Sequence, residues 1–225
     1  MKKLAKTSAK KMKKIKQKTY FVLILDKSGS MRSCSKQAVD HFNEQIQAIK
    51  SLKKGQEVRV YLVLFNHFVE MKLNNQPLSK IKQLKEQDYI ADGTTSLYDA
   101  IGMTIDTLKK DLTDLDKDNV KVFFSIVTDG HENSSHDYGG IDGAKKLKET
   151  ITELQKDDKW TFAYLGANHD VFAVASTFGM KTAYVSGYVS NAVGTAAATR
   201  GSITQLGNFF TGNSNPTHPL KVAKK

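Results

Sequence analysis

Apolar runs of strand length alternate along this chain with segments whose apolar residues recur every three or four positions. The strand-like runs cover residues 20–25, 58–65, 68–73, 120–127, 160–165 and 182–185. The helix-like segments cover residues 36–52, 101–112, 143–155, 170–178 and, with a composition rich in Ala, Thr and Gly, 190–210. The polar stretch 77–86 has only a weak helical pattern. These two periodicities predict alternating strands and helices.

Strands that alternate with helices form right-handed crossovers, which place parallel strands in one sheet. The run 68–73 follows 58–65 too closely for a crossover, so we expect an antiparallel hairpin there. The prediction is an α/β fold with a doubly wound, mostly parallel, Rossmann-like sheet, one antiparallel edge strand and helices on both faces. In such sheets ligands bind at the carboxyl ends of the strands.

The positive charge is concentrated at the two ends of the chain. Residues 1–18 contain nine lysines and no acid, and residues 221–225 contain three more lysines. Removing these twelve charges from the net charge of +11 leaves −1 for residues 19–220. We therefore expect a lysine-rich arm (1–18), one folded domain (19–212) and a loop with a basic tail (213–225). The arm either solubilises the protein or binds a polyanion such as nucleic acid.

Composition excludes several classes of protein. A single cysteine and three prolines exclude a disulfide framework and a Pro-rich scaffold. The longest apolar runs are far shorter than the ~18 residues of a membrane-spanning helix, so no membrane partner is expected. The arm resembles the start of a secretory signal, but the short apolar run after it ends at Asp26 with no cleavage site. We expect a cytoplasmic protein.

Three separate turns carry oxygen-bearing side chains and are placed to meet at one crevice. They are Asp26-Lys-Ser28-Gly-Ser30 after the first strand, Gly93-Thr94-Thr95 before a helix, and Thr128-Asp129-Gly130 after the strand at 120–127. Carboxylates and hydroxyls are hard donors that suit Mg²⁺, Mn²⁺ or Ca²⁺ and suit zinc or copper poorly. The pattern predicts a site for a hard divalent cation.

In this order, Asp-x-Ser-x-Ser, a Gly-x-Thr turn and Thr-Asp-Gly resemble the metal-ion-dependent adhesion site of von Willebrand factor type A domains. The resemblance spans residues 19 to about 190 and is strongest to small standalone bacterial and phage members. It implies that Ser28, Ser30 and Thr95 bind the metal directly through their hydroxyls. Asp26 and Asp129 would bind mainly through metal-bound water. Thr94 competes with Thr95, and the positions of Leu97 and Ala100 favour Thr95.

The resemblance further implies a function. The domain would bind Mg²⁺, or Mn²⁺ or Ca²⁺, and the metal's open coordination position would attract an Asp or Glu carboxylate of a protein partner. Such a module is not an enzyme. One alternative is a nucleic-acid-associated protein that binds through the lysine-rich arm and has a structural metal. Another is a metal-dependent phosphatase, which is disfavoured because Ser28 replaces the second acid which that chemistry needs two residues after Asp26.

The residues around the Thr-Asp-Gly turn leave two questions open. His131 and His136 flank the turn with a spacing that matches no helical pair, so we interpret them as rim residues rather than zinc ligands. Glu132, Asn133 and Ser134 follow the turn closely. They either line a partner-binding face or form a solvated loop.

Overall fold

A computed structural model describes residues 16–212 except 54, 157, 168–169 and 190. It contains a six-stranded sheet with the strand order β3-β2-β1-β4-β5-β6. The strands are β1 (Lys18–Asp26), β2 (Glu57–Phe65), β3 (Val69–Pro77), β4 (Val120–Thr128), β5 (Trp160–Ala167) and β6 (Val185–Tyr188). All neighbouring pairs are parallel except β2 and β3. The strand order reverses between β1 and β4, at the centre of the sheet.

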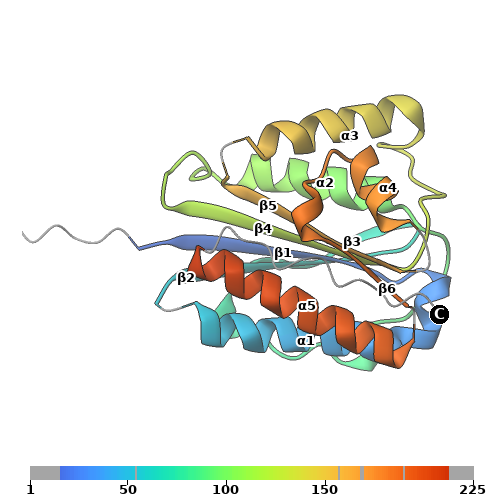
Figure 1. The fold of residues 1–225 in the computed structure, drawn as a ribbon, viewed down its shortest axis with the longest axis horizontal. Helices are drawn as coiled ribbons and strands as arrows, with labels where there is room; N and C mark the ends of the chain where they lie inside the picture. The colour runs from blue at the N-terminus through green and yellow to red at the C-terminus, as the bar shows by residue number, and fades with distance from the viewer. Residues whose placement is uncertain (1–15, 54, 157, 168–169, 190, 213–225) are drawn as a thin grey trace, which may run out of the picture.

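Helices cover both faces of this sheet (Figure 1). They are α1 (Ser35–Leu52), α2 (Leu97–Asp111), α3 (Gly140–Leu154), α4 (Val171–Thr177) and α5 (Ala192–Thr211). Helices α1 and α5 pack on one face with one core cluster, and α2, α3 and α4 pack on the other with a second cluster. The side chains of β1 alternate between the two clusters, so this central strand is buried on both faces, as its continuous apolar run predicts.

The predicted fold class is therefore confirmed, and several element boundaries differ from the prediction. The last strand covers Val185–Tyr188 rather than 182–185, because Thr182–Tyr184 forms a 3-10 turn in which Tyr184 N–H donates to Lys181 O. Strand β3 continues to Pro77 rather than ending at 73, and the stretch that follows it to residue 86 forms no α-helix and contains only short 3-10 turns. Helix α2 begins at Leu97, earlier than the predicted 101–112. None of the described helices is long and apolar enough to cross a bilayer.

The predicted arm and tail lie largely outside the described residues. The structure describes the chain from residue 16 and shows that Lys18 already belongs to β1. The segments 1–15 and 213–225 are outside the description, so the functions expected of them stay predictions.

Helix α5 packs against α1 through a buried polar cluster. His41 Nδ1 lies 2.9 Å from Thr199 Oγ1, and Gln45 Nε2 lies 2.5 Å from His41 Nε2. Gln45 also donates a 2.6 Å hydrogen bond to Ser202 Oγ. Burial lowers the pKa of His41 to about 4, so this imidazole is neutral in the fold at pH 7.

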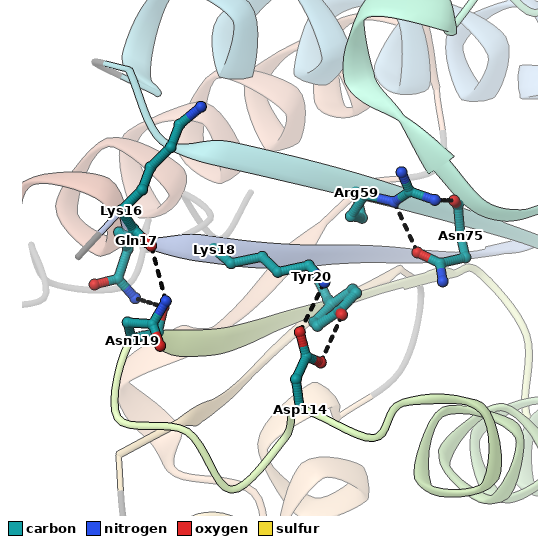
Figure 2. A network of polar contacts seen from close by, with 8 residues as sticks. All are labelled: Lys16, Gln17, Lys18, Tyr20, Arg59, Asn75, Asp114 and Asn119. Atoms are coloured by element: carbon teal, nitrogen blue, oxygen red, sulfur yellow. Dashed lines mark hydrogen bonds and ion pairs between the residues drawn. The ribbon is translucent and has the colours of Figure 1, made fainter.

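A separate polar network lies at the amino ends of the central strands (Figure 2). Asp114 lies between Lys18 and Tyr20, with a 2.7 Å ion pair to the lysine and a 2.7 Å hydrogen bond from the tyrosine hydroxyl. Arg59 of β2 donates a 2.9 Å hydrogen bond from its Nε to Oδ1 of Asn75 on β3. These side chains bond to one another at the amino ends of the strands, opposite the end where β1 finishes at Asp26.

Candidate metal centre

The carboxyl ends of β1 and β4 bring Asp26 and Asp129 to the centre of the sheet. Strand β1 ends at Asp26, β4 ends at Thr128, and Leu25 pairs with Val127 in the parallel register. The two strands lie where the strand order reverses, and such a switch point opens a crevice in doubly wound sheets. Both carboxylates are buried, at 0% and 7% exposed.

A chain of short contacts joins the Asp26-x-Ser-x-Ser turn to Asp129. Ser28 Oγ lies 3.1 Å from Ser30 Oγ, and Ser30 Oγ donates a 2.6 Å hydrogen bond to Asp129 Oδ1. The backbone N–H of Ser28 donates a 2.7 Å hydrogen bond to Asp26 Oδ1. Two of the predicted turns therefore meet, with their oxygens within hydrogen-bonding distance.

Thr95 brings the third turn to the same point. Its side chain is 3% exposed, whereas Thr94 is exposed. A Cβ placed on Gly130 would lie 3.1 Å from Thr95 Oγ1 and 3.6 Å from Ser30 Oγ, so both hydroxyls border the backbone of Gly130. Burial and position thus favour Thr95 over Thr94 as the third hydroxyl of the cluster.

The Asp26 carboxyl is held in an environment that disfavours its charge. Burial raises its pKa to about 6, and this effect exceeds the opposing effect of the hydrogen bonds from Thr128 and Ser28. The nearby Asp129 raises the pKa further. Thr128 Oγ1 donates to Asp26 Oδ2 at 2.5 Å. A cation placed between the two carboxylates would relieve this electrostatic cost.

The Thr95 turn is held against the first turn by backbone hydrogen bonds. Gly29 N–H donates to Gly93 O at 3.0 Å, and Asp92 N–H donates to Lys27 O at 3.0 Å. Gly93 has φ +70°, and the His67 ring occupies the space that a Cβ would fill. The positive φ therefore favours glycine at this position.

Asn66, directly after β2, supports the same turn. Its side-chain amide donates to Asp92 Oδ1 at 2.6 Å and to Asp92 O at 3.1 Å, and its backbone oxygen accepts from Ser96 N–H at 2.8 Å. The sequence reasoning missed this residue. Its position immediately after a buried strand was the available signal.

Glu132 organises the loop after Asp129. Its Oε2 accepts from Tyr98 N–H at 2.9 Å and from Ser135 Oγ at 2.6 Å. Its Oε1 accepts from the backbone N–H groups of Ser134 and Ser135 at 2.9 and 2.7 Å. The carboxylate thus ties the loop to the first turn of α2, where a negative charge is favourable.

Asn133 connects this loop to Thr95. Its Oδ1 accepts a 2.8 Å hydrogen bond from Thr95 N–H, and its own N–H donates a 3.1 Å bond to Thr95 O. Ser134 contacts Ser96 Oγ through its hydroxyl at 3.0 Å. The two interpretations left open for 132–134, a partner-binding face and a solvated loop, both omit this role: these side chains make internal bonds that position the site.

The two histidines near the turn are exposed, in keeping with rim positions. His136 Nδ1 contacts Asp137 Oδ1 at 3.2 Å. Within the described part of the chain, no group of three or more His, Cys, Asp or Glu side chains could hold a metal ion. A metal at this edge therefore needs the serine and threonine hydroxyls as ligands.

The hydroxyl spacing suits a small octahedral cation. Mg²⁺ binds oxygens at ~2.0–2.1 Å in near-ideal octahedral geometry, which separates adjacent ligand oxygens by about 2.9 Å. The Ser28 and Ser30 oxygens are 3.1 Å apart. Carboxylates that hydrogen-bond to the ligands from behind are the usual outer support of a metal site, and Asp129 already bonds to Ser30 in this manner.

Comparison with known protein families identifies the chain. The family model for the von Willebrand factor type A domain matches residues 21–206. The chain belongs to the von Willebrand factor type A family. Among curated proteins, no sequence matches this chain. The matched range contains all five residues predicted for the metal site.

Solved structures of other von Willebrand factor type A proteins share the fold. A protein from Catenulispora acidiphila has a TM-score of 0.57 at 12% identity over 87% of this chain and 43% of its own. Manganese-loaded TRAP protein from Plasmodium vivax has a TM-score of 0.56 at 14% identity, covering 86% of this chain and 74% of its own. At such identities the likeness concerns the fold alone, and the present chain spans less than half of the first protein.

A third solved structure carries a metal in its title. Proximal thread matrix protein 1 from the mussel byssus, titled with a zinc-occupied MIDAS motif, has a TM-score of 0.52 at 10% identity. The alignment covers 85% of this chain and 46% of the mussel protein. Manganese and zinc are therefore recorded for proteins that share this fold.

Proposed function

We propose that this von Willebrand factor type A domain is a divalent-cation-dependent protein-interaction module. Ser28, Ser30 and Thr95 bind Mg²⁺, or Mn²⁺ or Ca²⁺, through their hydroxyls. Asp26 and Asp129 act mainly through metal-bound water. The observation that carries this proposal is the contact chain from Ser28 through Ser30 to Asp129, which gathers two hydroxyls and a buried carboxylate within hydrogen-bonding distance.

The ligand set determines what the metal would attract. Because the three direct ligands are neutral, the cation keeps much of its charge toward any further ligand. An Asp or Glu carboxylate of a protein partner is the natural occupant of the remaining position. The proposal includes no catalysis, since Ser28 stands where a phosphatase of this topology would need a general acid. We also propose that the protein is cytoplasmic.

The direct test uses the smallest acidic probe. N-acetyl-aspartate amide is titrated into the isotope-labelled protein. Backbone NMR shifts are followed in the presence of millimolar Mg²⁺ and, separately, in the presence of EDTA. We expect saturable shifts at Thr95 and Gly130 only with Mg²⁺. N-acetyl-asparagine amide should leave these shifts unchanged. Equal shifts with EDTA, or with the Ser28→Ala/Ser30→Ala variant, would refute metal-mediated binding.

A second candidate function follows from the nine lysines of residues 1–18. A lysine-rich arm can bind nucleic acid with an affinity that falls steeply with salt. Binding of single- or double-stranded oligonucleotides, measured with and without residues 1–15, tests it. Salt-dependent binding that disappears on deletion supports this function, and an undiminished affinity in the shortened chain refutes it.

A further inference from the structure

A pocket lies at the end of the sheet opposite the proposed metal centre. It has a volume of about 370 Å³. It is bordered by the amino ends of β4 and β5, the 3-10 turn Thr182–Tyr184 and the C-terminal turn of α5. Figure 1 shows the C-terminal end of α5 at the side of the sheet where β1 begins. The volume of this pocket lies within the range of small-molecule sites.

The pocket is open because the edge of the sheet is incomplete at this point. Strand β6 pairs only with residues 164–167 of β5. Among the described residues, no strand lies beside residues 160–163 on this side, and the turn Thr182–Tyr184 comes directly before β6. Thr161 is half-buried and belongs to the pocket lining. The first half of β5 is therefore accessible to a ligand.

Three polar side chains of the lining have no polar partner among the residues that the structure describes. They are Lys121, Thr161 and Asn208, all half-buried. Thr161 pairs with Phe123 across β4 and β5, and Phe123 contacts Phe209 of α5. Because alternate residues of a strand share a face, Lys121 lies on this same side of the sheet. Polar groups that converge on one pocket can orient a small ligand.

Two half-buried aromatic rings, those of Tyr184 and Phe209, provide apolar surface in the lining. The Phe209 ring packs edge-on against Phe123 and Phe210, with ring centroids 5.0 and 5.4 Å apart. These contacts fix its orientation. A ring held in this way can pack against a flat ligand at low cost in conformational entropy. The walls therefore favour an aromatic ligand.

The charged residues of the lining leave one net positive charge. They are Lys121, Lys181 and Asp158. The Lys181 ammonium donates to Gln155 O at 3.0 Å and lies 3.3 Å from Asp158 Oδ1. Lys121 has no such partner among the described residues, so its ammonium is available to a ligand. This charge balance fits a ligand with a single negative charge, which favours a carboxylate over a doubly charged phosphate.

The end of α5 does not oppose an anion strongly. Free carbonyl groups give the C-terminus of a helix a partial negative charge. Here the N–H of the cap residue Gly212 already donates to the carbonyl oxygens of Asn208 and Phe209. Lys121 and Lys181 line the pocket at the same end of the helix. The surroundings of the pocket are therefore positive overall.

We propose that this pocket binds a small aromatic carboxylate. The carboxylate bonds to the Lys121 ammonium, and the ring packs against Phe209 and Tyr184. The Thr161 hydroxyl and the Asn208 amide supply further hydrogen bonds. The site goes beyond the proposed function, because it gives the domain a small-molecule ligand at the end of the sheet that the metal centre does not occupy.

Indole-3-acetate tests the pocket, and indole-3-acetamide is an uncharged control of nearly the same shape. Each is titrated into the isotope-labelled full chain in EDTA, so that no metal at the other end can bind the carboxylate. We expect saturable backbone NMR shifts at Thr161, Asn208 and Gly212, with a dissociation constant of about 1 mM or lower. The acetamide should bind about tenfold more weakly, because it lacks the charge-assisted bond to Lys121. Equal affinities, or no saturable shifts, overturn the proposal.

Lys121→Met tests the group that recognises the carboxylate. It removes the ammonium and keeps an apolar stem, so indole-3-acetate should bind about tenfold more weakly and indole-3-acetamide as before. The matched control is Lys145→Met, which removes an exposed lysine of α3 outside the lining and should bind both probes as the wild type does. An unchanged affinity for indole-3-acetate in Lys121→Met, an equal loss for both probes, or the same loss in the control overturns the proposal.

Two further variants locate the probe. Ala183→Phe places a ring at a half-buried position of the lining and should abolish binding of both probes; binding that survives overturns the proposal. Ser28→Ala/Ser30→Ala should bind indole-3-acetate as the wild type does, and a loss would place the probe at the metal centre instead. Failure of the probe leaves the metal site standing, and failure of metal binding leaves the pocket standing.

Discussion

Ser30 donates a 2.6 Å hydrogen bond from its Oγ to Oδ1 of Asp129, a residue 99 positions further along the chain. A serine hydroxyl can donate a hydrogen bond to a carboxylate while a lone pair on its oxygen binds a cation. The arrangement therefore orients Ser30 as a metal ligand and leaves Asp129 in support behind it. The hydrogen bond also joins the first turn of the site to the third.

The adjacent threonines provide a matched pair of variants. Thr95→Ala removes a buried hydroxyl of the cluster, whereas Thr94→Ala removes an exposed one. We expect the first variant to bind Mn²⁺ at least tenfold more weakly and the second to bind it as the wild type does. Titration calorimetry of the three proteins provides the measurement. Equal losses in both variants would contradict the assignment of Thr95.

We expect Asn133 to affect the metal affinity without contacting the metal. Asn133→Ala removes the acceptor of the Thr95 N–H and should cost about 1 kcal/mol of unfolding free energy. Because the Thr95 hydroxyl is then held less firmly, we expect Mn²⁺ affinity to fall about tenfold. Asn133→Asp keeps an acceptor oxygen and serves as the rescue variant. If Asn133→Ala lowers stability but leaves metal affinity unchanged, the positioning role is wrong.

The raised pKa of Asp26 predicts the pH dependence of the metal-free protein. Its folded pKa of about 6 lies above the ordinary value of 3.8, so proton uptake favours the folded state. This stabilisation is complete below pH 4 and is lost as the pH rises through 6. In EDTA, the Asp26 contribution should make the wild type about 1 kcal/mol more stable at pH 5 than at pH 7.5.

Asp26→Asn removes this titration and provides the control. The variant should be more stable than the metal-free wild type at pH 7.5, since no charge is buried, and it should bind Mg²⁺ weakly. Urea unfolding at both pH values gives the comparison. A variant that is less stable than the metal-free wild type at pH 7.5 would show that the carboxylate is not electrostatically destabilising.

The lowered pKa of His41, at the α1–α5 interface, predicts that this residue's contribution to the free energy of unfolding has the opposite pH dependence. Burial lowers its pKa to about 4, below the ordinary 6.5, so its contribution to stability is present above pH 6.5 and is lost as the pH falls toward 4. The loss between pH 7.5 and pH 5 should be about 2 kcal/mol. His41→Gln can still bond to Thr199 and does not titrate. In EDTA its unfolding free energy should lack this acid loss, and an unchanged loss would place the titration elsewhere.

The fold was predictable because the apolar pattern carries it. The continuous apolar run 20–25 marks a strand buried on both faces, and the close spacing of β2 and β3 marks the antiparallel hairpin. The predicted last strand began three residues too early. Residues Thr182–Tyr184 have a composition typical of a strand, but they form a 3-10 turn directly before β6. A single 3-10 turn is too short to produce a recognisable hydrophobic periodicity in the sequence.

The site was predictable only as far as its ligands. Three turns with hydroxyl and carboxylate side chains are visible in the sequence, and the structure brings their residues together. The roles of Glu132 and Asn133 were not predictable, because their bonds run from loop side chains to the backbone of α2 and Thr95.

The most direct test of the metal centre is thermal unfolding of the wild type and of Ser28→Ala/Ser30→Ala with EDTA and with Mg²⁺, accompanied by titration calorimetry. At a Mg²⁺ concentration of about 100 times its dissociation constant, the wild type should gain ~2.7 kcal/mol of unfolding free energy. The double variant should gain nothing and give no binding heat. An equal gain in both proteins would contradict a cation held by these hydroxyls.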